Sequence, residues 1–240
     1  MIDDLLKLNP FSLETKIKNK IFLKQTKYLT IHHFKKCHIY KKIIKNLKFK
    51  VNNTCKIEDF PMLPVRLFKK FELKSISDNQ IIKKLVSSGT TGQNLSKIYL
   101  DKKNSINQSK VLNKIMSNLL GKQRLPMLII DQDPKIRETS VFNARIAAIQ
   151  GFSIFGKDYH YLLDKKNKIN YNLLNKFLKK YENEKFFIFG FTSFIYEFLI
   201  KKLDKKKINF NFKNAILLHG GGWKKLEKVK IDNKNFKKKI

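Results

Sequence analysis

The chain has 240 residues, of which 42% are hydrophobic, so it is long enough for one large domain or two small ones and is not a disordered protein. Its formal net charge is +33, but 48 of its 52 basic residues are Lys. Proteins that read nucleic acids rely on Arg for bidentate contacts. The excess Lys accompanies abundant Ile, Asn and Phe, which indicates a bias toward A/T-rich codons. We therefore expect no specific nucleic-acid partner, only non-specific binding to polyanions at low salt.

The sequence contains no targeting or cross-linking signal. No apolar stretch is long enough to span a bilayer, and the N-terminus lacks the basic and apolar regions of a secretory signal. Cys37 and Cys55 show neither metal-ligand spacing nor a disulfide framework. These features favour a cytoplasmic protein.

The first 50 residues predict two helices. Ser12 and Thr30 stand at the positions of N-caps for helices over 12–29 and 30–47. The second contains three histidines, which could suggest a metal site, but a third ligand is missing beside His33 and Cys37. We interpret it as a helix with partly buried histidines.

Residues 57–74 contain two prolines and predict an extended connector. From residue 80 the pattern changes to short apolar runs that alternate with longer amphipathic segments. The runs predict strands over 81–87, 97–100, 126–131, 185–190 and 214–219. The longer segments predict helices over 104–120, 171–182, 192–206 and 223–230. The prediction is a helical N-terminal segment with its connector over 1–80, followed by a layered α/β region with a partly parallel sheet over 81–240.

Two of the predicted strands end in glycine-rich loops, "SSGTTG" at 87–92 and "HGGGW" at 219–223. Ligands of parallel sheets sit at the carboxyl ends of the strands. The first loop offers backbone N–H groups and four hydroxyls, which suit a phosphate, although it lacks the Gly-Lys-Ser/Thr of a Walker A motif. The second allows close backbone approach to a flat ligand. Each loop could equally be an ordinary turn.

The order of these loops and of several further segments resembles a known family. The segments are "FPMLPVRLFKKFELKS", "SKIYLD", "RLPMLIID", "GFSIFGKDYHYLLD", "FIFGFTSFIYEFL" and "LLHGGGWKKLEK". They look like the bacterial acyl-protein synthetases, the LuxE-type long-chain fatty acid–luciferin-component ligases of the adenylate-forming superfamily. The resemblance runs from about Phe11 to the last residues.

This resemblance implies the fold of the large domain of adenylate-forming enzymes. It also implies ATP- and Mg²⁺-dependent activation of a long-chain fatty acid or another carboxylate, followed by acyl transfer to a protein thiol. The residues that match the phosphate loop are Ser87, Ser88, Gly89, Thr90, Thr91 and Gly92. Those that match the glycines lining the nucleotide base are Gly220, Gly221 and Gly222. Those that match the strand end near the acyl pocket are Phe189, Gly190 and Phe191.

The sequence also departs from the family. Lys97 is no clean counterpart of the Lys that usually follows the phosphate loop, and neither Cys37 nor Cys55 matches the acyl-accepting Cys. A Tyr-Gly-x-x-Glu-type motif, a ribose-binding Asp and a catalytic lid Lys follow the glycine triplet in relatives. The resemblance thus implies an N-terminal portion, truncated before the C-terminal lid and inactive alone. The alternative is a non-catalytic remnant, or one half of a split enzyme, that binds nucleotide or a partner protein.

Overall fold

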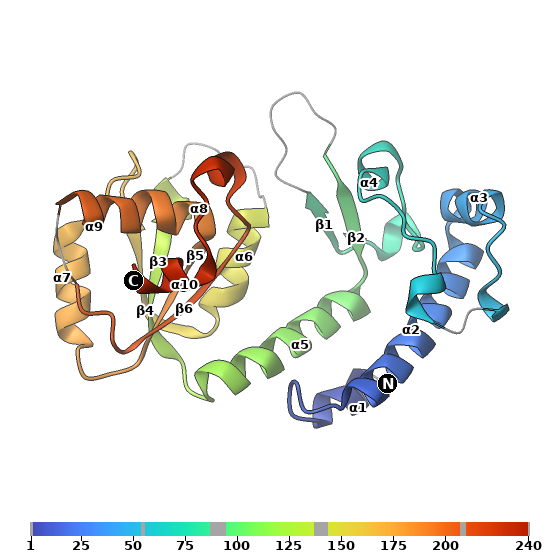
Figure 1. Ribbon diagram of the computed structural model, residues 1–240, viewed down its shortest axis with the longest axis horizontal. Coiled ribbons are helices and arrows are strands. Elements are labelled where there is room, and N and C mark those ends of the chain that lie inside the picture. The colour runs from blue at the N-terminus through green and yellow to red at the C-terminus, as the bar shows by residue number, and fades with distance from the viewer. Residues whose placement is uncertain (1, 54–55, 87–94, 137–143, 207–209, 240) are drawn as a thin grey trace. The chain divides into compact units, whose positions relative to one another are not determined.

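The computed structural model describes residues 2–53, 56–86, 95–136, 144–206 and 210–239 (Figure 1). Contacts divide the chain into two compact units, Met1–Asn118 and Leu119–Ile240. No helix within the described residues has the length and apolarity needed to cross a membrane. The boundary between these units lies later than the predicted division after residue 80. The division after residue 80 stays a prediction.

The first unit begins with three helices. They are α1 (Ile2–Lys7), α2 (Thr15–Lys36) and α3 (His38–Asn46). The predicted N-caps are wrong: α2 begins after Glu14, two residues beyond Ser12, and Thr30 is buried within α2. Thr30 is only 5% exposed, so its side chain is packed inside the first unit and does not cap a helix. The break between the helices falls at Cys37, whose backbone is extended.

The connector over 57–74 is mostly irregular, but it is not purely extended, because it contains a 3₁₀ turn (Ile57–Asp59) and α4 (Leu67–Lys70). Further 3₁₀ turns cover Val51–Asn53 and Asp78–Gln80. Two predicted strands are confirmed as β1 (Lys83–Val86) and β2 (Lys97–Leu100), which form an antiparallel two-stranded sheet of their own. The long α5 (Lys102–Leu120) follows, as predicted, and its first turn is capped by the Asp101 carboxylate, which accepts a hydrogen bond from the Asn104 N–H.

The second unit is built on a four-stranded parallel sheet with the order β4-β3-β5-β6. Its strands are β3 (Leu125–Gln132), β4 (Gly156–Leu163), β5 (Phe186–Phe191) and β6 (Ala215–Gly220). Three of them confirm predictions: β3 and β5 are buried strands with continuous apolar runs, and the edge strand β6 also begins with an apolar run, "AILL". The sequence prediction missed β4. Its segment "GKDYHYLL" mixes charged and apolar residues because an edge strand is only partly covered.

Helices cover both faces of this sheet. They are α6 (Ala144–Ser153), α7 (Tyr171–Lys180), α8 (Thr192–Phe194), α9 (Lys201–Lys206) and α10 (Asn233–Lys238). A π-helical stretch (Ile195–Ile200) joins α8 to α9 within the predicted helix over 192–206. The predicted helix over 223–230 is instead a 3₁₀ helix (Lys224–Val229). The sequence prediction also missed α6 and α10.

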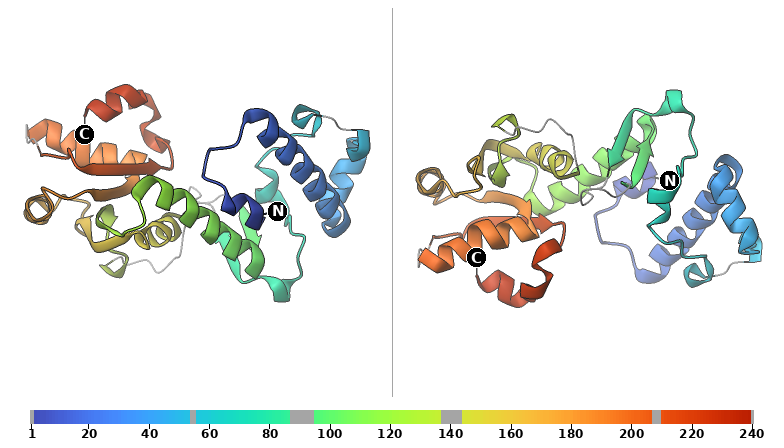
Figure 2. Two further views of the ribbon diagram at one scale, coloured as in Figure 1. Left: turned by 90° about the horizontal axis from the view of Figure 1, so that it is seen from below. Right: turned by 90° about the horizontal axis from the view of Figure 1, so that it is seen from above.

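Alternation along the strands gives each face of the sheet its own helices. Leu128 and Ile188 point to one face, in a core cluster that includes residues of α7 and α10 and of the π-helical stretch. Phe189 points to the other face, where its ring packs against Phe152 of α6 at 4.6 Å between centroids. Figure 2 shows α6 and α9 on opposite sides of the sheet.

The topology singles out one position on the sheet. The connection after β3 leads outward to β4 on one side, whereas the connection after β5 leads to β6 on the other. The carboxyl ends of β3 and β5 therefore form a topological switch point, the place where open parallel sheets bind ligands.

Candidate functional site

The candidate site is the carboxyl edge of the parallel sheet, where β3, β5 and β6 end side by side. Ile130, Gly190 and His219 lie in one row across these strands, and Phe191 pairs with Gly220 in the next row. A side chain at position 190 would collide with Ile130 and Ile195. Glycine there lets the helix after β5 pack tightly against the strand end.

A glycine turn follows β6 at this edge. Gly221 and Gly222 have φ angles of +82° and +68°, in the left-handed region that glycine adopts without a steric penalty. A Cβ atom on Gly221 would lie 2.4 Å from Cδ1 of Phe191, whereas a Cβ on Gly220 or Gly222 would meet nothing within 4 Å. The turn therefore touches β5 at its middle residue and presents bare backbone to open space at the other two.

A buried threonine ties this turn to the end of β5. Thr192 Oγ1 lies 3.0 Å from the Gly220 carbonyl oxygen and 3.0 Å from His219 Nδ1. The carbonyl can only accept, so the single hydroxyl proton goes to Gly220, and His219 Nδ1–H must donate to Thr192. Burial lowers the pKa of His219 below its ordinary value, which keeps the ring neutral at pH 7. The ring also stacks on Phe236 at 4.8 Å.

A buried ion pair lies at the same edge and was not predicted. Asp131, near the end of β3, is only 1% exposed, and its Oδ2 lies 3.4 Å from Arg145 Nε on α6. Its Oδ1 accepts a 2.7 Å hydrogen bond from the Gln132 N–H. The guanidinium group also lies over the Phe194 ring at 4.5 Å. An Asp directly after the apolar run "PMLII" was the signal in the sequence, but its partner is 14 residues away.

The predicted site residues have different outcomes. The phosphate-loop residues 87–92 lie outside the described residues, although the strands β1 and β2 flank that segment on both sides. The three glycines Gly220–Gly222 lie at the carboxyl edge of the sheet. Phe189 is 4% exposed and Gly190 is buried, so only Phe191 of that trio is partly exposed at the edge. The assigned roles of all these residues stay predictions.

The Mg²⁺ that the resemblance implies stays a prediction. The described residues contain no group of three or more His, Cys, Asp or Glu side chains that could hold a metal ion. The Asp131 carboxylate at the edge is already paired with Arg145.

Two histidines of the first unit, His32 and His33, line a separate pocket of about 1000 Å³. His33 Nδ1 lies 2.7 Å from Ser75 Oγ, and burial lowers the pKa of His33. Cys37 also lines this pocket and is buried. The prediction of partly buried histidines is confirmed for His32 and His33, whereas His38 is exposed.

Comparisons with known proteins point to one family. The model of the family described as acyl-protein synthetase, LuxE, matches residues 1–240. Nine chains of solved structures match, and two of them are crystal structures of 2-hydroxyisobutyryl-CoA ligase. One is in the postadenylation state with 2-HIB-AMP, with a TM-score of 0.61 and 11% identity over 87% of this chain and 44% of that chain. The other, with 2-HIB-AMP and CoA in the thioesterification state, has a TM-score of 0.61 and 12% identity over 91% of this chain and 48% of that chain.

The chain thus spans less than half the length of these two ligases. At such identities the likeness shows the fold alone, which is the fold of adenylate-forming enzymes. No curated protein matches the chain.

Proposed function

Because the chain belongs to the acyl-protein synthetase, LuxE, family, we propose that it provides the nucleotide-binding part of a ligase that activates a carboxylate with ATP. The observation that carries this proposal is the Gly220–Gly222 turn at the end of β6. It presents bare backbone and open space at the carboxyl edge of a parallel sheet, next to the topological switch point.

The proposed reaction has two steps. A carboxylate oxygen of the substrate attacks the α-phosphorus of ATP, which forms the acyl–phosphate bond of an acyl-adenylate and releases pyrophosphate. A thiolate of an acceptor protein then attacks the acyl carbonyl carbon, which forms a thioester and releases AMP. By family resemblance, we propose a long-chain fatty acid as the substrate and a protein cysteine as the acceptor.

The roles of this chain's residues follow from the chemistry of that reaction. Negative charge grows on the departing pyrophosphate, and preorganised N–H and O–H donors stabilise it. We assign this task to the loop over 87–92, which is rich in such donors. The backbone of Gly220–Gly222 would lie along the face of the adenine base, and Thr192 would keep the turn in place. The exposed part of Phe191 would contact the substrate beside the base.

The proposal is tested by calorimetric titration of the chain with ATP. A Thr90→Ala/Thr91→Ala double variant loses two hydroxyl donors, and each lost hydrogen bond to a charged group should weaken binding by about 1.5–3 kcal/mol. The matched control is Ser109→Ala/Ser117→Ala, which removes two hydroxyls from α5 and should leave the affinity unchanged. Equal ATP affinity in the double variant and the wild type would refute the role of the loop. Fatty-acid-dependent exchange of pyrophosphate into ATP, measured with this chain and a second polypeptide that carries the missing motifs, would test the first chemical step.

A further inference from the structure

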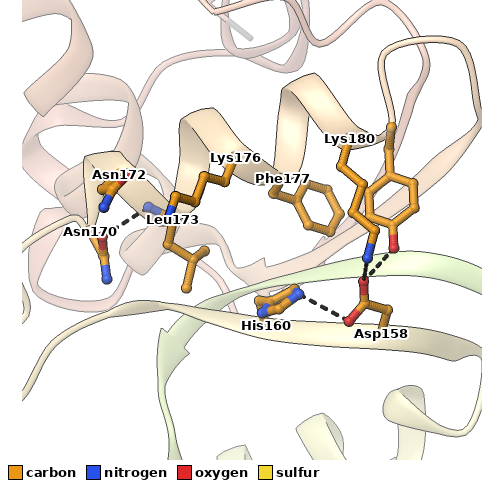
Figure 3. A pocket seen from close by; sticks show the side chains of 9 residues that line it. Asp158, His160, Asn170, Asn172, Leu173, Lys176, Phe177 and Lys180 are labelled. Atoms are coloured by element: carbon orange, nitrogen blue, oxygen red, sulfur yellow. Dashed lines mark hydrogen bonds and ion pairs between the residues drawn. The ribbon is translucent and has the colours of Figure 1, made fainter.

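A pocket of about 410 Å³ lies between β4 and α7 in the second unit (Figure 3). Its volume is in the range of small-molecule sites. His160 lies in the same row of the sheet as Leu128 and Ile188, two residues before the row that ends in His219. Moreover, β4 is three strands away from β6, or about 14 Å at about 4.8 Å per strand. The pocket is therefore distinct from the candidate nucleotide site.

One end of the pocket is a fixed carboxylate. Asp158 Oδ2 lies 2.7 Å from Lys180 Nζ and accepts a hydrogen bond from the Tyr181 hydroxyl, while Oδ1 lies 3.2 Å from His160 Nε2. The hydrogen bonds from Lys180 and Tyr181 lower the pKa of Asp158 to about 2. Asp158 also has a φ angle of +43°, in the left-handed region, which Asp enters more readily than most residues with a Cβ.

This carboxylate orients the histidine. Because His160 Nε2 faces Asp158, Nδ1 is the ring nitrogen left for other contacts, and Figure 3 shows the imidazole on the pocket wall opposite α7. The ring packs edge-on against Phe177 at 5.9 Å. Both oxygens of Asp158 are used in these contacts, so its charge is compensated within the protein.

The groups that remain are suited to an anion. Lys176 and Asn172 line the pocket, and neither has a hydrogen-bond or ion-pair partner among the residues that the structure describes. Together they offer a cation and an amide donor to a ligand, while Leu173 and Phe177 supply apolar surface beside them. Lysine and amide donors around a small pocket suit a phosphate group. We propose that this pocket binds a small soluble phosphate ester, with the phosphate at Lys176 and the organic group against Leu173.

The matched variants Lys176→Ala and Lys179→Ala test this proposal. Each variant removes one exposed lysine from α7, so the two lose the same overall charge. Only Lys176 lines the pocket. The probes are phenyl phosphate and inorganic phosphate, titrated calorimetrically into the nucleotide-free chain. We expect Lys176→Ala to weaken phenyl phosphate binding at least tenfold and Lys179→Ala to change it less than twofold. Similar losses in both variants would mean that surface lysines bind the anion non-specifically and would overturn the proposal.

Two further readouts test the geometry of the pocket. Phenyl phosphate should bind more tightly than inorganic phosphate, because its ring covers apolar surface; equal affinities would overturn the assignment of an ester. In NMR spectra, the ring signals of His160 should move during the titration of the wild type. Unmoved His160 signals at saturation would place the ligand elsewhere.

Discussion

The glycine turn after β6 can be tested by adding one methyl group at a time. In Gly221→Ala, the new Cβ would lie 2.4 Å from Cδ1 of Phe191, and the backbone has a φ of +82°. A left-handed backbone costs about 1–2 kcal/mol for a residue with a Cβ, and overpacking adds about 1–3 kcal/mol. The free energy of unfolding should therefore fall by about 2–5 kcal/mol.

The neighbouring glycines provide graded controls. Gly222 shares the left-handed backbone but has open space, so Gly222→Ala should cost only about 1–2 kcal/mol. Gly220→Ala meets neither obstacle and should change stability by less than about 0.5 kcal/mol. Urea unfolding followed by circular dichroism measures all three. If Gly221→Ala is as stable as Gly220→Ala, the turn does not contact Phe191 as described and the reasoning fails.

Three further predictions concern buried groups. Thr192→Val should lower the free energy of unfolding by about 1–3 kcal/mol in urea titrations, since it leaves Gly220 O and His219 Nδ1–H unpartnered. Thr192→Ser keeps the hydroxyl and should retain most of the wild-type free energy of unfolding. Burial lowers the pKa of His219 below its unfolded value of about 6.5, so the unfolded state binds more protons below that pH. The free energy of unfolding should consequently fall as the pH drops below 6.5, and it should fall less steeply in His219→Gln. Equal pH dependence of the free energy of unfolding in the variant and the wild type would contradict this role of His219. In a Cys55→Ser variant, the buried Cys37 should react with a thiol reagent only on unfolding, and fast reaction of the native chain would contradict its burial.

The central strands of the second unit were predictable because each is a continuous apolar run with one neighbour on either side. β3 and β5 show this directly, with Met127, Ile129 and Phe187 all fully buried. β4 was not predictable in the same way. At the edge of the sheet, Asp158 and His160 replace apolar residues, and they interrupt the pattern that identifies a buried strand.

The candidate site also contains residues that the sequence could identify and residues that it could not. Gly220–Gly222 could be recognised because three successive glycines are visible in the sequence itself. Thr192 and Arg145 could not, because their roles depend on partners 28 and 14 residues away that only the folded chain brings close. The break at Cys37 was missed for the same reason, since Thr30 resembles an N-cap in the sequence and only the folded chain shows that it is buried within α2.

The most direct test of the central claim is to map where the adenine base lies. The chain is irradiated with 8-azido-ATP, digested, and its labelled peptides are identified by mass spectrometry. The account predicts label on peptides that contain Phe191–Thr192 or Gly220–Trp223, suppressed by excess ATP and reduced in Gly221→Ala. Label that ATP suppresses but that falls only on other peptides, such as those covering 158–181, would contradict a nucleotide site at the carboxyl edge of the sheet.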